Sequence, residues 1–291
     1  KFWKMTPLTP EAMKFSMETM FLHWTIVPYA IYTVPAVVFG FMYYNAKRPF
    51  SIASEMAPVL GKYSTRPLTM KIIDAITLFS IGAGMAGSVA QGFLNISGGV
   101  SNILGIPSEP GLWLIVAIVT GVAVVFTSIS GIQKAMKHVS NINVYGYIVF
   151  LVFLLVFSNA PFLLNLATEA MGGFIDGFFD KILLTGASAD SQWPQWWTTF
   201  YWFSWMAWAP PSGAFMGRIA YGRKVKHVLG LYIGVCAAVS AIWMTLVSGT
   251  ALWTQKSGAA DLVASYNSGV ENVPYDMLES MPFSDVVIIL F

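Results

Sequence analysis

Six stretches of about 20 mostly apolar residues follow one another along this chain, and their length restricts the fold more than any other feature does. A helix needs about 20 such residues to cross roughly 30 Å of hydrocarbon, where its backbone must satisfy its own hydrogen bonds. The composition agrees, because 56% of the residues are hydrophobic and only 10% are charged. We therefore predict an all-α polytopic membrane protein. The expected spans are Met17–Tyr43, Ile72–Asn95, Leu112–Gln133, Val144–Leu164, Trp196–Met216 and Val228–Trp253, and a seventh begins at Phe283.

Residues suited to disulfides or metal ions are few. Cys236 is the single cysteine and has no partner for a disulfide. The histidines His23, His138 and His227 lack the i, i+4 pairing of a zinc-binding helix. We therefore expect no metal site. A net charge of +2 is too small to indicate a nucleic-acid partner.

We expect the chain to be an interior piece of a longer protein. It begins at Lys1 and stops inside the apolar run Val286–Phe291, and no signal peptide is visible. Residues 1–291 are predicted to form a single transmembrane domain.

Lysine and arginine alternate between the connections, which predicts the orientation, because positively charged loops stay on the cytoplasmic side. The connections after spans one, three and five carry Lys47, Arg48, Lys62, Arg66, Lys71, Lys134, Lys137, Arg218, Arg223, Lys224 and Lys226. The intervening connections hold only Lys181 and Lys256. We therefore place the loops with Arg48, Lys137 and Arg223 in the cytoplasm and the protein in the inner (plasma) membrane. The N-terminal lysines are a mild exception.

Two further segments have alternative interpretations. Phe162–Leu183 is predicted to form an amphipathic helix along the outer surface, or else an ordinary packed loop helix. Residues 82–87 read GAGMAG and satisfy the dinucleotide pattern G-x-G-x-x-G. That pattern needs a preceding strand and a βαβ unit, whereas these glycines lie inside an apolar span. Close helix packing or flexing is the preferred interpretation.

Aromatic residues are concentrated in the fifth span. They are Trp196, Trp197, Phe200, Tyr201, Trp202, Phe203, Trp205 and Trp208. Trp196 and Trp197 suit an interfacial belt, but Trp205 lies nine residues further, which is roughly 14 Å along a helix and close to the membrane midplane. Trp202, Trp205 and Trp208 fall within an arc of about 120° on one side of the helix. A stripe of indoles at this depth indicates more than an anchor.

The first span supplies a second aromatic set. Trp24, Tyr29 and Tyr32 lie around Pro28, which disturbs the helix. Each residue alone is more typical of packing than of ligand binding. Together with Trp205 they are predicted to form a cage.

No aspartate or glutamate lies in the interior of a complete span, since Glu18 and Asp74 are at span ends. A transported cation is ordinarily held by an intramembrane carboxylate. Ring faces can instead hold a quaternary ammonium, at about 0.5 to 2 kcal/mol per face, without a protein counter-ion. The pattern favours a methylated onium group over a primary amine or a metal ion.

Three motifs resemble those of the betaine/carnitine/choline transporter family. Residues 200–210 read FYWFSWMAWAP and residues 213–223 read GAFMGRIAYGR. FLHW at residues 21–24 is followed by PYAIY at residues 28–32, and SGIQKAMKHVSNIN occupies residues 130–143. The motifs have the family's order and spacing. The chain departs from the family at Tyr29 and Ser204, where the family usually has Trp, and at Pro211, where it has Phe.

The resemblance implies an inverted-repeat fold like that of the leucine transporter, with family helices four to nine and the start of ten in this chain. It implies secondary active transport of a small quaternary ammonium or sulfonium zwitterion, such as glycine betaine, choline, carnitine or dimethylsulfoniopropionate, in a homotrimer within the lipid bilayer. The implied binding residues are Trp24, Tyr29, Tyr32 and Trp205 with Trp208 beside them, and Trp202 joins them through the indole stripe. No cofactor is expected, and the ligands of a coupling Na⁺ or H⁺ are expected outside this chain.

Two other classes compete with a transporter. An onium-sensing membrane receptor or channel can use the same cage, but a channel also needs a polar pore lining. A membrane enzyme needs a nucleophile with a base, and no such catalytic residues are recognised in the sequence. We therefore predict that the protein is not an enzyme.

Overall fold

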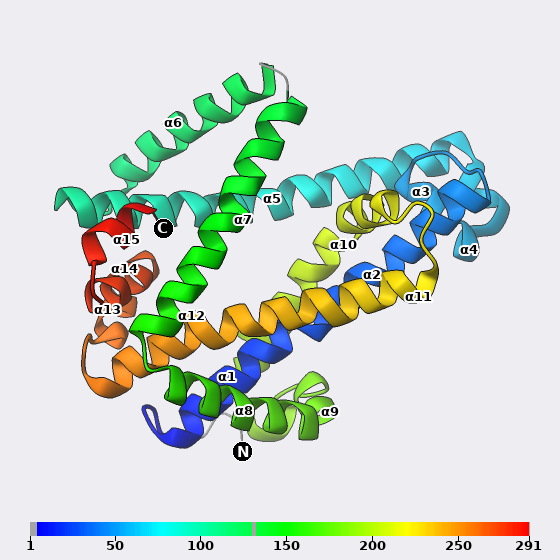
Figure 1. Cartoon of the computed structure of the whole chain (residues 1–291). Helices are drawn as coiled ribbons and strands as arrows, with labels where there is room; N and C mark the ends of the chain where they lie inside the picture. Colours follow the sequence, from blue (N-terminus) through cyan, green and yellow to red (C-terminus); the bar gives the residue numbers. More distant parts are fainter. Residues whose placement is uncertain (1–4, 130–131, 291) are drawn as a thin grey trace. The chain divides into compact units, whose positions relative to one another are not determined.

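The structure is a computed structural model that describes residues 5–129 and 132–290 (Figure 1). Within these ranges the side chains of residues 127–129, 132–138, 189 and 290 are not described, so Lys137 and most of the motif at residues 130–143 lie outside the described residues. All regular elements in the described residues are helical, as predicted. The chain divides into two compact units, Lys1–Gly87 with Glu169–Met244 and Ser88–Thr168 with Thr245–Phe291. The single domain over residues 1–291 stays a prediction.

The helices follow one another with short connections (Figure 1). The first group comprises α1 (Pro10–Trp24), α2 (Ile26–Gly40), η1 (Phe41–Asn45), α3 (Ile52–Glu55), α4 (Ala57–Leu60), η2 (Gly61–Thr65), α5 (Pro67–Leu104), α6 (Pro110–Ile129) and α7 (Ile132–Phe157). The second comprises α8 (Ala160–Asp176), α9 (Phe178–Ile182), η3 (Ala187–Ala189), η4 (Gln195–Thr199), α10 (Phe200–Ile219), α11 (Val225–Leu229), η5 (Gly230–Cys236), α12 (Ala237–Ser257), α13 (Leu262–Ser268), η6 (Val270–Asn272), α14 (Val273–Glu279) and α15 (Ser284–Leu290).

Four helical stretches in the described residues are long and apolar enough to cross a membrane, and a shorter apolar helix covers Pro110–Phe126. The four are Pro10–Asn45, Pro67–Leu104, Val139–Phe157 and Val225–Ser257. The predicted fifth span forms η4 and α10 but is not among the four, because its tryptophans, serines and prolines lower its mean hydropathy. The prediction of a multi-pass helical membrane protein is confirmed, and α15 begins where the seventh span was expected.

The structure corrects the predicted fourth span. Val144–Leu164 was expected to be one helix, but α7 ends at Phe157 and α8 begins at Ala160. The side chain of Asn159 explains the new start, since its Oδ1 accepts a hydrogen bond from the Phe162 N–H at 3.0 Å. An asparagine at this position caps a helix by satisfying an amide that has no partner within it.

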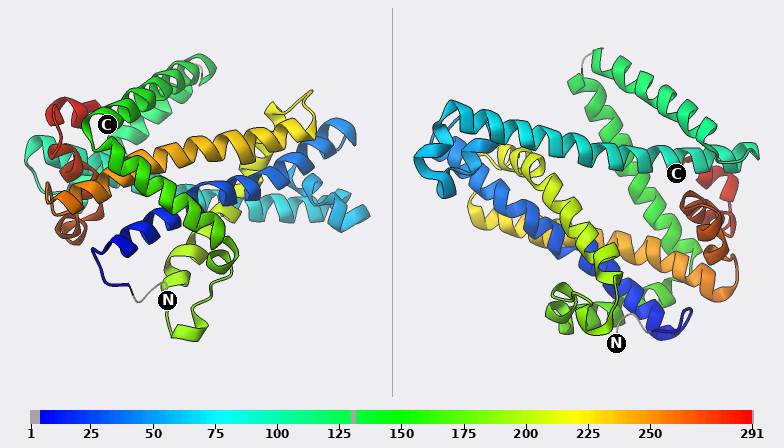
Figure 2. Two further views of the ribbon diagram at one scale, coloured as in Figure 1. Left: turned by 60° about the horizontal axis from the view of Figure 1, so that its bottom comes forward. Right: turned by 180° about the vertical axis from the view of Figure 1, so that it is seen from behind.

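In the first unit, α2 and α10 lie side by side in both views of Figure 2. Glycines allow this close approach. A Cβ at Gly213 would lie 2.6 Å from the Pro35 Cβ, and one at Gly217 would lie 2.7 Å from the Ala36 carbonyl oxygen. Small residues at a helix crossing bring the two backbones together, and here they bring the two predicted aromatic sets together.

The glycine-rich segment at residues 82–87 lies within the long helix α5. A Cβ at Gly84 would lie 3.6 Å from the Trp208 Nε1. At Gly82 and Gly87 no atom of the described residues lies within 4 Å of the position that a Cβ would take. The helical interpretation is therefore confirmed, whereas close helix packing stays a prediction, because the contact at Gly84 is an ordinary van der Waals distance to a side chain.

The predicted surface helix forms as two pieces, α8 and α9, separated at Gly177. Phe174 is buried in the structure, while Ile175 and Phe179 are exposed. The buried positions of α8 recur at helical spacing at Leu163, Leu166, Ala170 and Phe174.

Two of the positively charged connections lie together. The rings of Tyr44 and Tyr221 have centroids 4.7 Å apart, and the Arg218 guanidinium lies 5.8 Å from the Phe50 ring. The Tyr44 hydroxyl also donates to the Arg218 carbonyl at 3.0 Å. The connection after the first span and the end of α10 therefore share one end of the first unit.

In the second unit, the helices after α12 pack on α5 through Tyr275. Its hydroxyl donates to the Asn95 carbonyl at 2.6 Å. A Cβ at Gly99 would lie 2.9 Å from that hydroxyl oxygen, so a glycine is needed there. Tyr275 also joins a buried apolar core that includes Leu154, Leu163 and Leu278.

Candidate aromatic substrate site

The first span is interrupted next to the predicted cage. α1 ends at Trp24, and Thr25 has φ −108° and ψ −109°, which is not helical, before α2 begins at Ile26. Pro28 has no N–H to donate to the Trp24 carbonyl, so a continuous helix loses a hydrogen bond here. The N–H of Thr25 donates to the Phe21 carbonyl at 3.1 Å, and its buried hydroxyl donates to the same carbonyl.

Trp205 is anchored to the end of α1. Carbonyls in the last turn of a helix lack donors from within that helix, and the His23 carbonyl is one of them. It accepts a hydrogen bond from the Trp205 indole N–H at 2.9 Å. The position of this indole therefore depends on where the first span breaks.

The rings of Trp24, Tyr32, Tyr201 and Trp205 form one group, which we call the aromatic cluster. Trp205 contacts the other three, with centroid distances of 5.0 Å to Trp24, 6.2 Å to Tyr32 and 5.7 Å to Tyr201. The planes of Trp24 and Trp205 meet at 75° and those of Tyr32 and Trp205 at 87°. Near-perpendicular contacts at these distances place the edge of one ring against the face of the next, so the rings pack on one another. The structure thus brings together three predicted site residues, Trp24, Tyr32 and Trp205.

Tyr29 lies one turn before Tyr32 on α2 and makes a different contact. Its hydroxyl is 2.9 Å from the Ser240 hydroxyl on α12, where either oxygen can donate. In the described residues, no ring contact joins Tyr29 to the cluster. Ser240 was not among the predicted residues, because its contact with Tyr29 spans 211 positions in the sequence.

Trp202 and Trp208 also have their own neighbours. The Trp202 ring meets the His23 ring edge-on at 5.8 Å, while Trp208 faces Gly84 of α5. Within the described part of the chain, neither contacts the Trp205 ring. The three tryptophans predicted to share one side of the helix therefore serve different contacts.

Two residues of the site, His23 and Tyr201, were not predicted from the sequence. His23 is buried, its Nε2 lies 3.1 Å from the Thr198 hydroxyl, and its ring stacks on Tyr201 at 4.7 Å. Tyr201 precedes Trp205 by four residues, so the two share a helix face. That spacing was a signal for Tyr201, and adjacency to Trp24 was a signal for His23.

The buried carboxylate of the first span already has a partner. Glu18 Oε2 lies 3.2 Å from Lys181 Nζ of α9, and both side chains are nearly inaccessible. Lys181 Nζ also donates to the Gly173 carbonyl at 2.8 Å. A buried charge is tolerated when it is paired and hydrogen-bonded. Glu18 is therefore engaged two turns away from the cluster.

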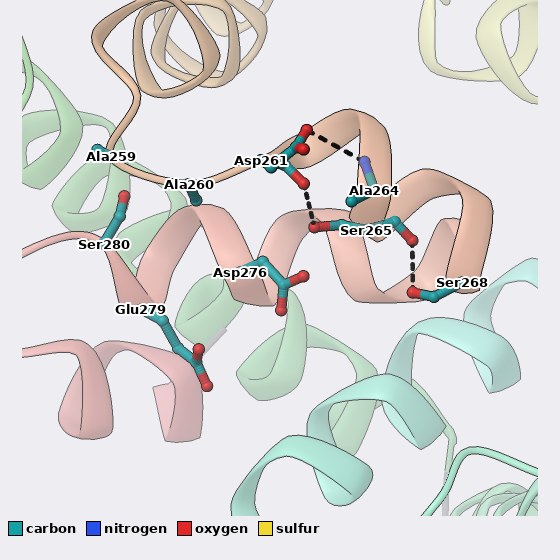
Figure 3. A pocket seen from close by; sticks show the side chains of 9 residues that line it. All are labelled: Ala259, Ala260, Asp261, Ala264, Ser265, Ser268, Asp276, Glu279 and Ser280. Atoms are coloured by element: carbon teal, nitrogen blue, oxygen red, sulfur yellow. Dashed lines mark hydrogen bonds between the residues drawn. The ribbon is translucent and has the colours of Figure 1, made fainter.

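A cavity in the second unit is of another kind (Figure 3). It has a volume of about 630 Å³ and lies among α13, α14 and the turn before them. Figure 3 shows the carboxylates of Asp261, Asp276 and Glu279 with serines, and no aromatic ring lines it. Among the described residues, no three His, Cys, Asp or Glu side chains are placed so that they could hold one metal ion. This cavity is not the predicted cage.

Comparison with known proteins agrees with the motifs. Residues 2–291 match the model of BCCT, described as betaine/carnitine/choline family transporter. The chain is 30% identical over 279 residues to a probable glycine betaine transporter of Desulfitobacterium hafniense (strain Y51), which covers 95% of this chain and 55% of that protein.

Two further relatives show the range of substrates named for similar proteins. The glycine betaine transporter OpuD of Bacillus subtilis (strain 168) is 27% identical, covering 97% of this chain and 55% of that protein. The ectoine/hydroxyectoine transporter of Virgibacillus pantothenticus is 24% identical, covering 97% and 56%. The chain therefore spans about half the length of the curated relatives it matches.

Proposed function

Because this chain belongs to the betaine/carnitine/choline transporter family, we propose that the whole protein is a secondary active transporter of a small quaternary ammonium or sulfonium zwitterion. Glycine betaine, choline, carnitine and dimethylsulfoniopropionate are the candidate substrates. The family consists of transporters, which agrees with the prediction that the protein is not an enzyme. Transport proceeds by alternating access, with the substrate held near the membrane midplane.

The observation that carries this proposal is the contact of Trp24 and Tyr32 with Trp205. Aromatic faces attract a quaternary ammonium, most strongly when the group is desolvated. Trp205 is fixed at both its N–H and its ring, so little conformational entropy is lost when it binds a ligand. We assign the onium group to Trp24, Tyr32, Tyr201 and Trp205, with Tyr29, Trp202 and Trp208 around them.

Among the described residues, the ring contacts and the indole hydrogen bond of the aromatic cluster include no carboxylate, which supports an onium group over a primary amine. A primary ammonium carries three N–H donors that need acceptors once buried. Glu18, the buried carboxylate of the first span, is paired with Lys181. A methylated onium group has no N–H to satisfy, so ring faces are sufficient.

We also propose that the protein is a multi-pass protein of the inner membrane, with Arg48, Lys137 and Arg223 in the cytoplasm. The charge alternation supports this orientation, and the contact of Tyr44 with Tyr221 is consistent with one side for the Arg48 and Arg223 connections. Single cysteines at these three positions should resist an impermeant thiol reagent added from outside. Strong labelling of any of them would reverse the orientation.

A homotrimer is proposed from the family resemblance alone. The exposed apolar residues Ile175 and Phe179 on α8 and α9 provide surface for contact. Native mass spectrometry of the full-length protein should show trimers, and a population of monomers only would exclude this assembly.

The direct test of function is uptake by the full-length protein in proteoliposomes, under a Na⁺ or an H⁺ gradient. At least one of the four candidate substrates should accumulate against its concentration gradient. In a separate binding measurement, Trp205→Leu should weaken the binding of that substrate by roughly 1 to 2 kcal/mol. Trp205→Phe should retain part of the affinity. The matched control is Trp196→Leu, because Trp196 is 72% exposed. Binding without accumulation would instead indicate a receptor, and downhill flux alone would indicate a channel.

A further inference from the structure

His23, near the end of α1, holds Trp205 in two ways. Its carbonyl accepts the Trp205 N–H at 2.9 Å. Its buried ring stacks on the Tyr201 ring, with centroids 4.7 Å apart and planes at 29°. The Tyr201 ring in turn stacks on the Trp205 ring, at 5.7 Å and 27°. These contacts form a closed loop that begins and ends at His23.

The orientation of the His23 ring depends on Thr198. The Thr198 hydroxyl lies 3.1 Å from His23 Nε2, and both side chains are buried. Thr198 belongs to the π-helical turn η4 and precedes Tyr201 by three residues, and both contact the same imidazole. A buried ring nitrogen or hydroxyl that loses its partner is left unsatisfied at a cost in free energy. The hydrogen bond therefore keeps the imidazole in one orientation.

From this loop we infer that His23 and Thr198 are positioning residues for the substrate site. Their hydrogen bond fixes the imidazole, the imidazole fixes the Tyr201 ring, and that ring fixes the plane of the Trp205 indole. The inference rests on the proposed function. It adds that binding of the cationic group depends on a hydrogen bond that lies outside the aromatic cluster.

The physical reason is that cation–π attraction depends on direction. A cation is attracted when it lies over the face of a ring, within about 6 Å of the centroid. Burial of apolar groups is roughly proportional to the buried area and has no direction. A tilt of Trp205 therefore weakens a charged ligand more than an uncharged group of the same shape. A residue that only supports the fold would weaken both ligands alike.

Glycine betaine and 3,3-dimethylbutanoate, in which carbon replaces the charged nitrogen, separate these cases. Their dissociation constants are measured by calorimetry on the full-length protein, for the wild type, Thr198→Val, Thr198→Ser and His23→Phe. Thr198→Val removes the hydroxyl, and His23→Phe keeps a flat ring but removes the nitrogen. Each should reduce the preference for betaine over the isostere by roughly three- to tenfold. Thr198→Ser keeps the hydroxyl and should restore most of that preference.

The matched control is Thr250→Val on α12. Thr250 is buried like Thr198, but its hydroxyl donates to the Leu246 carbonyl of its own helix. This control should leave the preference for betaine unchanged. Because His23 and Thr198 share one hydrogen bond, the double variant Thr198→Val with His23→Phe should lose no more of the preference than His23→Phe alone.

The outcomes separate this inference from the function it rests on. If Trp205→Leu weakens betaine but Thr198→Val and His23→Phe keep the wild-type preference, the positioning role is wrong and the transporter assignment stands. Equal weakening of both ligands, or additive losses in the double variant, would also overturn the positioning role. If the wild type binds none of the four candidate substrates, both are wrong. Should His23→Phe fail to fold, the comparison of Thr198→Val with Thr198→Ser decides.

Discussion

At the scale of single residues, Trp205 shows how this chain fixes an aromatic side chain inside an apolar span. Its N–H is bonded to the His23 carbonyl, and its ring is bounded by Trp24, Tyr32 and Tyr201. A buried indole usually finds a hydrogen-bond partner, and here the end of α1 provides it. The backbone of one helix thereby sets the position of a binding side chain on another.

The Glu18–Lys181 pair gives a prediction about stability. Lys181→Met removes the partner of Glu18 and the donor to the Gly173 carbonyl, leaving a buried carboxylate without a counter-ion. We expect a loss of about 3 to 5 kcal/mol in the free energy of unfolding, seen as a lower melting temperature. The double variant Glu18→Gln with Lys181→Met should recover most of it. A single variant as stable as the wild type would show that the pair contributes little.

Glu55 gives a prediction about pH. It lies on α3 between the first two spans, its Oε1 is buried without a hydrogen-bond partner among the described residues, and burial raises its pKa from 4.5 to about 8. Because the folded protein holds this proton more tightly, the contribution of Glu55 to stability is present below pH 4.5 and is lost as the pH rises through about 8. Glu55→Gln should flatten the fall in melting temperature between pH 5 and pH 9. An identical slope in variant and wild type would contradict the raised pKa.

At the scale of helices, the break at Thr25 divides the first span between two roles. The α1 part carries Trp24 and the ion pair of Glu18, and the α2 part carries Tyr29 and Tyr32. The α2 part is held against α10 by Gly213 and Gly217, where no larger residue fits without a shift. The geometry of the cluster thus depends on one close helix crossing.

Gly217→Ala tests that crossing. The added Cβ would lie 2.7 Å from the Ala36 carbonyl oxygen, which is backbone and cannot move alone. We expect a loss of about 1 to 3 kcal/mol in stability and weaker betaine binding, because α2 moves away from Trp205. The control is Gly172→Ala in α8, where no described atom lies within 4 Å. It should leave stability unchanged or slightly higher. Equal effects of the two substitutions would exclude a special role for the crossing.

The length of the apolar stretches was enough to predict the helices, because a membrane leaves the backbone few alternatives. The disturbance of the first span was expected from Pro28, although its position at Thr25 was not. The separation of α7 from α8 was not predicted, since it depends on one local hydrogen bond at Asn159. Contacts between distant segments were harder still. The motif resemblance indicated Trp24, Tyr32 and Trp205, but nothing local in the sequence indicates that Tyr29 meets Ser240.

At the scale of the whole molecule, the chain is a helical membrane protein that belongs to a transporter family. It spans about half the length of the curated relatives it matches. The proposed site lies within one compact unit, made by α1, α2, α10 and α12. The inverted repeat, the coupling ion and the trimer stay predictions, to be tested on the full-length protein. Within this chain we propose that ring faces, rather than a protein charge, hold the cationic group.

The most direct test of that claim compares glycine betaine with 3,3-dimethylbutanoate, which has carbon in place of the charged nitrogen. Dissociation constants are measured by calorimetry on the full-length protein at low and high salt, for the wild type and Trp205→Leu. Betaine should bind the wild type at least about tenfold more tightly than the isostere. This difference should shrink in Trp205→Leu and change little with salt, because no protein charge is involved. Equal affinity for the two ligands, or a preference for betaine that Trp205→Leu leaves intact, would show that the ring faces do not hold the cationic group.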